Sequence, residues 1–136
     1  MPAYGNYVLT KGSAPVAPIT KFRFVKATGV QSGYGDGNKI QVTAITANTD
    51  VAIGVAQEAI TAVDVSRGKG LPIAEMGITE MEAGSVVAAG DQIATDSVGR
   101  ATTLGASGAG TVVFGVAMTS AAAIGNRVAV RLIAQA

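Results

Sequence analysis

The sequence contains neither cysteine nor histidine, and these absences exclude much of the chemistry open to a small protein. Without cysteine there is no disulfide, no thiolate nucleophile and no sulfur ligand for a metal. Without histidine the chain lacks the commonest general base near neutral pH and the commonest zinc ligand. We therefore expect a protein that is not an enzyme and that holds no metal and no cofactor.

Aromatic residues are also scarce, at 4% of the chain, and tryptophan is absent. Hydrophobic residues still make up 49%, but many of them are alanines, which bury little area each. A core this thin often gains part of its stability from an oligomer or a bound surface. The composition therefore favours a protein that works by packing against other molecules.

Charge and hydropathy argue against two further classes of partner. The formal net charge is only +1, so no overall positive charge points to nucleic acid. No apolar run is long enough for a membrane-spanning helix, and the N-terminus lacks the basic and apolar regions of a signal peptide. We expect no nucleic-acid partner, no membrane partner and synthesis in the cytoplasm.

Alternating apolar and polar residues predict β-strands along most of the chain. In the segment 127–132, Val128, Val130 and Leu132 alternate with polar or small residues. In the segment 21–26, Phe22 and Phe24 alternate with basic residues, which predicts a strand with one basic face. Further strands are expected at 39–45, 51–56, 71–76 and 112–117, with a hairpin over 85–103 whose turn is at 96–99. Residues 57–65 fit a short helix and a strand equally well.

Together these segments give about eight to ten short strands and predict an all-β fold, either a small β-sandwich or a barrel. We assign residues 21–136 to a single β domain, because a chain of this length normally forms one core. The sequence VAIGVA at 51–56 resembles VVFGVA at 112–117, and residues 68–73 loosely match 125–130. This similarity suggests an internal duplication built on a Gly-Val-Ala unit.

Residues 1–20 contain three of the four prolines and are interpreted as an extended N-terminal arm. The alternative is a frayed terminus with an edge strand at 7–10. An arm that contacts a neighbouring molecule would use its tyrosines as low-entropy anchors. The candidate contacts in the arm are Tyr4, Tyr7, Leu9 and Lys11, and those in the strand after it are Lys21, Arg23 and Lys26.

Two other motifs have simpler explanations. Within the Gly-rich segment 27–38, residues 33–37 resemble a phosphate-binding loop, but a strand rather than a helix follows them. Asp36–Asn38 is too short for a calcium loop. We expect a surface turn there, with Tyr34 at its tip as a further candidate contact. Glu75, Glu80 and Glu82 resemble paired catalytic carboxylates, but no partner base is nearby, and their spacing predicts a solvated strand face.

Four stretches of the chain resemble the capsid cement, or head decoration, proteins of tailed bacteriophages. They are ITKFRFVKATG, VAIGVAQEAITAVD, AAGDQIATDSVGRATT and VVFGVAMTSAAAIGNRVAVRLIAQA. In that family a hairpin with the pattern Gly-Asp-x-hydrophobic … Asp … Gly-x-Ala precedes a Gly-Val-Ala strand and a terminal V-x-V-x-L strand. The residues that match are Gly90–Ile93, Asp96, Gly99 and Ala101 in the hairpin, and Gly115–Ala117, Val128, Val130 and Leu132 in the ending.

The resemblance covers residues 20–136, apart from the loop at 28–38, and implies a structural protein of the virion. Such a protein binds the outer surface of an assembled capsid and clamps neighbouring major capsid subunits. The implied partners are the major capsid protein and other copies of this chain, commonly as a trimer, after synthesis in the host cytoplasm. Two alternatives stay open: another virion β module (a tail, baseplate or fibre-associated subunit), and a carbohydrate-binding β-sandwich, which the absence of tryptophan disfavours.

Overall fold

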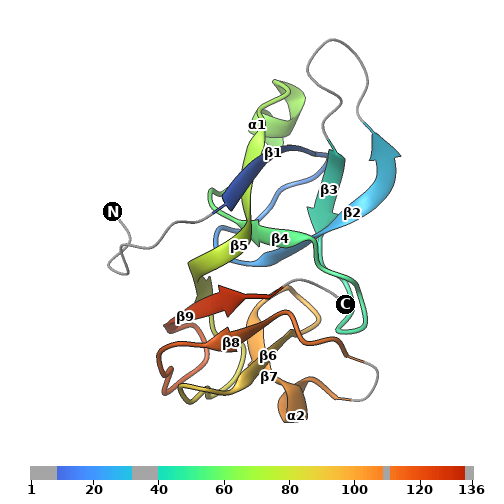
Figure 1. The fold of residues 1–136 in the computed structure, drawn as a ribbon. Coiled ribbons are helices and arrows are strands. Elements are labelled where there is room, and N and C mark those ends of the chain that lie inside the picture. The colour runs from blue at the N-terminus through green and yellow to red at the C-terminus, as the bar shows by residue number, and fades with distance from the viewer. Residues whose placement is uncertain (1–8, 32–39, 109–110, 134–136) are drawn as a thin grey trace.

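A computed structural model describes residues 9–31, 40–108 and 111–133 of the chain (Figure 1). The fold is all-β, with 47% of residues in strands and 7% in helices, and it contains a closed five-stranded barrel, so the fold class expected from the sequence is confirmed. The strands are β1 (Leu9–Pro15), β2 (Phe24–Gln31), β3 (Ile40–Ala44), β4 (Gly54–Ala56), β5 (Leu71–Glu82), β6 (Gln92–Thr95), β7 (Ala101–Thr103), β8 (Gly115–Ala117) and β9 (Arg127–Leu132). The helices are α1 (Ala62–Ser66) and α2 (Leu104–Ser107).

The barrel occupies the upper half of Figure 1. Its strands follow the order β1-β3-β2-β4-β5, and it closes because β1 also pairs with β5. The hydroxyl of the buried Ser13 donates a hydrogen bond of 2.8 Å to the carbonyl oxygen of Leu71 at this closure. The sequence assigned residues 1–20 to an arm, but residues 9–15 form β1, an integral barrel strand; residues 1–8 lie outside the described part of the chain.

The long strand β5 belongs to two groups of strands. Its first half, Leu71–Met76, pairs with β1 and β4 in the barrel. From Gly77, which has a φ of 92°, its second half pairs with β9 instead. The second group has the order β5-β9-β8-β6-β7 and curls back on itself, because Ala83 forms a parallel bridge to Ala101 of β7.

The strand pairing of the first group recurs in the second group with the same register. Each residue of a matching pair in the first group has one equivalent residue in the second group, and the equivalent residues pair with each other in the same way. The matching pairs are Val25–Ala44 and Ile93–Thr103, Phe24–Val55 and Gln92–Val116, Ala56–Ile73 and Ala117–Val130, Ser13–Leu71 and Met81–Val128, Ile19–Ile60 and Val87–Ala121, and Pro15–Val42 and Ala83–Ala101. The chain is therefore a tandem duplication, and we call its halves the first module (9–76) and the second module (77–133). The duplication suggested by the Gly-Val-Ala units extends through every strand.

The two modules differ mainly in the connections between their strands. The connection between β2 and β3 is longer than that between β6 and β7, and each module carries a short helix that the other lacks at the equivalent place, α1 before β5 and α2 before β8. Thr61 begins α1 through a capping box: its hydroxyl accepts from the Asp64 backbone NH at 3.2 Å, and the Asp64 carboxylate accepts from the Thr61 NH at 3.0 Å. Part of the ambiguous segment 57–65 is therefore helical. Neither helix in the described part of the chain is long and apolar enough to cross a bilayer.

The strand expected at 21–26 starts later than the alternation suggested. Phe22 has a φ of 63°, which breaks the extended conformation, and β2 begins at Phe24. Phe24 is buried while Phe22 is half-buried, so the two rings do not share one strand face as predicted. The hairpin at 85–103 is confirmed for β6 and β7, but its first arm begins at Gln92 rather than at residue 85.

Candidate functional site

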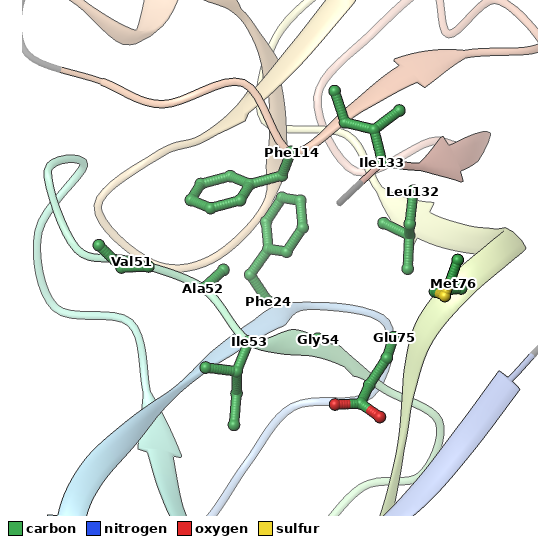
Figure 2. A pocket seen from close by; sticks show the side chains of 10 residues that line it. All are labelled: Phe24, Val51, Ala52, Ile53, Gly54, Glu75, Met76, Phe114, Leu132 and Ile133. Atoms are coloured by element: carbon green, nitrogen blue, oxygen red, sulfur yellow. The ribbon is translucent and has the colours of Figure 1, made fainter. Parts of the chain in front are cut away.

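An open apolar groove lies where the two modules meet, with a volume of about 410 Å³ (Figure 2). The first module supplies residues from β2, β4 and the first half of β5, and the second supplies the approach to β8 and the end of β9. The residues that line it are Phe24, Val51, Ala52, Ile53, Gly54, Glu75, Met76, Phe114, Leu132 and Ile133. Nine of the ten are apolar, and Glu75 carries the single charge.

Two buried aromatic rings line the inner part of the groove, one from the start of β2 and the other from the residue before β8. The rings of Phe24 and Phe114 lie side by side in Figure 2, with centroids 5.2 Å apart and planes at 49°. Val51, Met76 and Ile133 are exposed at 57%, 51% and 39%, so the groove keeps apolar surface in contact with water. Exposed apolar surface gathered in one place is typical of a binding surface.

Residues 22–24 join the modules beside this groove. The backbone NH of Glu82 donates to the carbonyl oxygen of Phe22 at 3.0 Å, and the NH of Phe24 donates to that of Gly99 at 2.7 Å. The Arg23 guanidinium forms a two-point ion pair with Glu82, at 3.1 Å and 3.3 Å. Backbone and side-chain contacts therefore fix the two modules relative to each other.

A cluster of cations surrounds one phenyl ring at this junction. The Lys21 ammonium lies 4.6 Å and the Arg127 guanidinium 4.4 Å from the centroid of Phe22. Lys21 and Arg127 are exposed and belong to different modules. We call these three residues the cation–aromatic cluster.

Lys26 is held by the turn that precedes β4. Its ammonium donates to a carboxylate oxygen of Asp50 at 2.8 Å, and the same oxygen accepts from the backbone NH groups of Thr46 and Ala47. Hydrogen bonds from Lys26 and Thr46, assisted by the lysine charge, lower the pKa of Asp50 to about 2. The carboxylate therefore stays ionised and keeps Lys26 paired over the ordinary pH range.

The candidate contact residues predicted from the sequence differ in whether they are paired within the chain, exposed, or outside the described residues. Arg23 and Lys26 are engaged in internal ion pairs, whereas Lys21 is exposed beside Phe22. The backbones of Leu9 and Lys11 lie in β1, in register with Met76 and Ile73. The predicted contacts Tyr4, Tyr7 and Tyr34 lie outside the described residues.

Sequence reasoning missed both the groove and the part that Phe22 and Arg127 play in the cluster. The groove joins residues from positions 24 to 133, and only the pairing of β5 with both modules brings them together. The Gly-Val-Ala repeat was the available signal. Aligning the two halves on this repeat would have made Phe114 the residue equivalent to Ile53. Each module would then be seen to place an apolar side chain just before its Gly-Val-Ala strand, where the groove lies.

Residues 14–132 match the sequence model of a protein family that is described as phage cement protein. The chain belongs to the phage cement protein family. Membership gives it a structural role in the phage capsid and associates it with the virion, as the resemblance of the four stretches implied. The match begins inside β1 and ends at the last residue of β9, so it spans both modules.

The fold of this cement-family chain is also similar to a solved structure. That structure is described as the head fiber gp8.5 N base in bacteriophage phi29. The TM-score is 0.64 with 18% sequence identity, over 93% of this chain and 95% of the other. At this identity the likeness concerns the fold, and its coverage includes both modules. No curated protein matches the sequence.

Proposed function

We propose that the protein is a cement protein that binds the exterior of a phage capsid and clamps neighbouring major capsid subunits. The observation that carries this proposal is the tandem duplication with one register in both modules. A capsid is an array of copies of one protein, so a chain with two similar modules offers similar surfaces to two adjacent copies. Two linked contacts bind more tightly than either alone, because the second is made at high effective concentration.

The rigidity of the junction supports a clamp rather than a flexible tether. The modules share β5 without a linker, and the Arg23–Glu82 ion pair and the backbone hydrogen bonds of residues 22–24 cross between them. A rigid spacing loses little conformational entropy on binding when it matches the spacing of the sites. The exposed apolar groove would supply contact area at the centre of such a clamp.

The partners in this proposal are the major capsid protein and further copies of the chain, as a trimer. The thin, alanine-rich core and the exposed Val51 and Met76 favour assembly with other surfaces. The role is structural and non-enzymatic, with no nucleic-acid or membrane partner, and the protein acts on the outer capsid surface after synthesis in the host cytoplasm. The small net charge and the lack of histidine and cysteine fit this role.

Cosedimentation of the purified protein with expanded and unexpanded shells of its phage tests the proposal. We expect saturable binding to expanded shells and higher resistance of the bound shells to heat. Light scattering of the free protein would give the copy number of its oligomer. The absence of binding at every salt concentration would exclude a cement function.

A second candidate function is the base of a fibre on the capsid head, favoured by the shared fold over 93% of this chain with the head fiber N base. A base and a cement protein both bind the shell, but only a clamp has to bridge neighbouring capsid subunits, so we expect it to stabilise the shell more. Heating shells with and without bound protein separates the two functions, because we expect a clamp that bridges subunits to raise the temperature at which the shells open by more than a base does.

A further inference from the structure

Phe22 adopts a backbone conformation that its side chain disfavours. Among the residues that the structure describes, it is the only non-glycine with a positive φ, at 63°. The counterpart of Phe22 in the second module is Gly90, with a φ of 94°. The equivalence is direct, because the NH of Phe22 donates to Ala56 at 2.8 Å as the NH of Gly90 donates to Ala117 at 2.7 Å.

In the second module, a glycine adopts the positive φ at the equivalent position. Glycine adopts a positive φ without a steric penalty, whereas a residue with a Cβ pays one. The phenylalanine of the first module therefore lowers stability relative to glycine, unless the contacts of its ring compensate. A costly side chain at a half-buried position points to a function of the side chain itself.

The surroundings of the ring are equally specific to one module. Lys21 and Arg127 both lie within 4.6 Å of its centroid. Their counterparts in the other module, Ala89 and Gly70, have no charge, so all three members of the cluster are absent there. The second module forms the same strands without these three side chains, so the fold of a module does not require the cluster.

No carboxylate among the described residues forms an ion pair with the cations of the cluster, Lys21 and Arg127. Glu82 is opposite Arg127 in the β5–β9 ladder, but both of its oxygens already bind Arg23. Two cations thus share one ring at the surface, and their donors are available to an anion.

We propose that Phe22, Lys21 and Arg127 form a docking point for an acidic segment, rich in Asp and Glu side chains, on the surface of the major capsid protein. A guanidinium packed on a ring keeps its planar edge free, and this edge fits a carboxylate with two parallel hydrogen bonds. The ring fixes both cations before binding, which lowers the entropy lost on docking. This inference rests on the proposed capsid-binding function and names one of its contacts.

The deciding variant is Phe22→Gly, because it separates folding from docking. Glycine suits the observed φ, so we expect a melting temperature equal to or above that of the wild type. We expect at least a tenfold loss of affinity for expanded shells in cosedimentation. Lys21→Gln with Arg127→Gln should give a similar loss and a weaker dependence of binding on salt.

Arg67→Gln with Lys69→Gln is the matched control, since it removes two exposed charges next to α1 and should change affinity less than twofold. Unchanged shell binding by Phe22→Gly would overturn the proposal, and a lowered melting temperature with unchanged binding would assign the ring to the module junction alone. Tighter binding of a single-stranded oligonucleotide than of an oligoglutamate peptide through the same residues would also overturn it.

If the wild-type protein fails to bind shells, the proposed function is excluded. Binding of the oligoglutamate peptide then tests the cation–aromatic cluster independently of that function. Binding of this peptide by the wild type, lost in Phe22→Gly and kept in the control, would support an acidic ligand. If the wild type does not bind the peptide, the proposal that the cluster binds an acidic segment is overturned.

Discussion

Gly54 and Gly115 occupy the same position in the two modules, each at the start of a Gly-Val-Ala strand and each pressed against the backbone of the next strand. A Cβ added to Gly54 would lie 2.8 Å from the carbonyl oxygen of Ala74. A Cβ added to Gly115 would lie 2.6 Å from the carbonyl oxygen of Arg131. The repeat therefore conserves a close strand approach that only glycine permits.

Substituting either glycine by alanine should destabilise the whole chain. A backbone carbonyl cannot swing away as a side chain can, so the strands must separate, at a cost of about 1–3 kcal/mol. We expect Gly115→Ala to lower the melting temperature by roughly 3–10 °C, and Gly54→Ala to act in the same direction. Calorimetry measures both shifts.

Gly105→Ala is the control for these variants. A Cβ there meets nothing within 4 Å, and the residue lies in α2, where alanine is the better helix former. This variant should be neutral or slightly stabilising. A loss of stability as large as that of Gly115→Ala would mean that close strand approach is not the cause.

Acid should weaken the fold through Asp50. Its pKa is lowered from 3.8 to about 2 in the folded chain, so its contribution is fully present above pH 4 and is lost as the pH falls toward 2. Asp50→Asn should flatten the decline of the unfolding free energy over this range, as followed by urea denaturation. Parallel declines for the wild type and Asp50→Asn would contradict the assignment.

The rings of Phe24 and Phe114 should be energetically coupled across the module boundary. Their tilted contact at 5.2 Å predicts a coupling free energy of about 0.5–1.5 kcal/mol in a double-mutant cycle of Phe24→Leu and Phe114→Leu. A cycle of Phe114→Leu with Val42→Ala, in the other core cluster, serves as the control and should be additive. Additivity in both cycles would show that the rings pack independently.

Removal of the cap of α1 should have a local effect. None of the residues of α1 is fully buried, and Val65 alone among them packs, partly buried, against a core cluster, so the helix contributes little to the core. Thr61→Ala should speed hydrogen exchange at the NH of Val65, which donates to the Thr61 carbonyl oxygen, and leave the melting temperature nearly unchanged. A large fall in melting temperature would indicate that α1 supports the barrel.

Much of the fold was accessible to sequence reasoning because the alternation of Val128, Val130 and Leu132 sets one buried face in a strand. The expected strand 127–132 coincides with β9, and the nearly apolar segment 51–56 contains β4, which is buried between β2 and β5. Phe22 shows where alternation misleads: the pattern assumes an extended backbone, and a single residue with positive φ shifts the start of the strand.

The candidate site was less accessible, because charge alone does not reveal which partner a side chain finds. Arg23 and Lys26 were predicted as contacts from their charge, and the pattern gave no sign that Glu82 and Asp50, distant in sequence, pair with them. Arg127 was not singled out, since its closeness to Phe22 follows from β5 serving both modules. Contacts of this kind depend on closure of the strands and not on local pattern.

The sharing of β5 also has a mechanical consequence. A force that pulls the two modules apart acts along the covalent backbone at Gly77, where one ladder ends and the next begins. No side-chain interface has to slip before this tension reaches the second module. Each half of β5 is held by the ladders of its own module, so we expect tension to load both sets of ladders together and the molecule to resist it as a single mechanical unit.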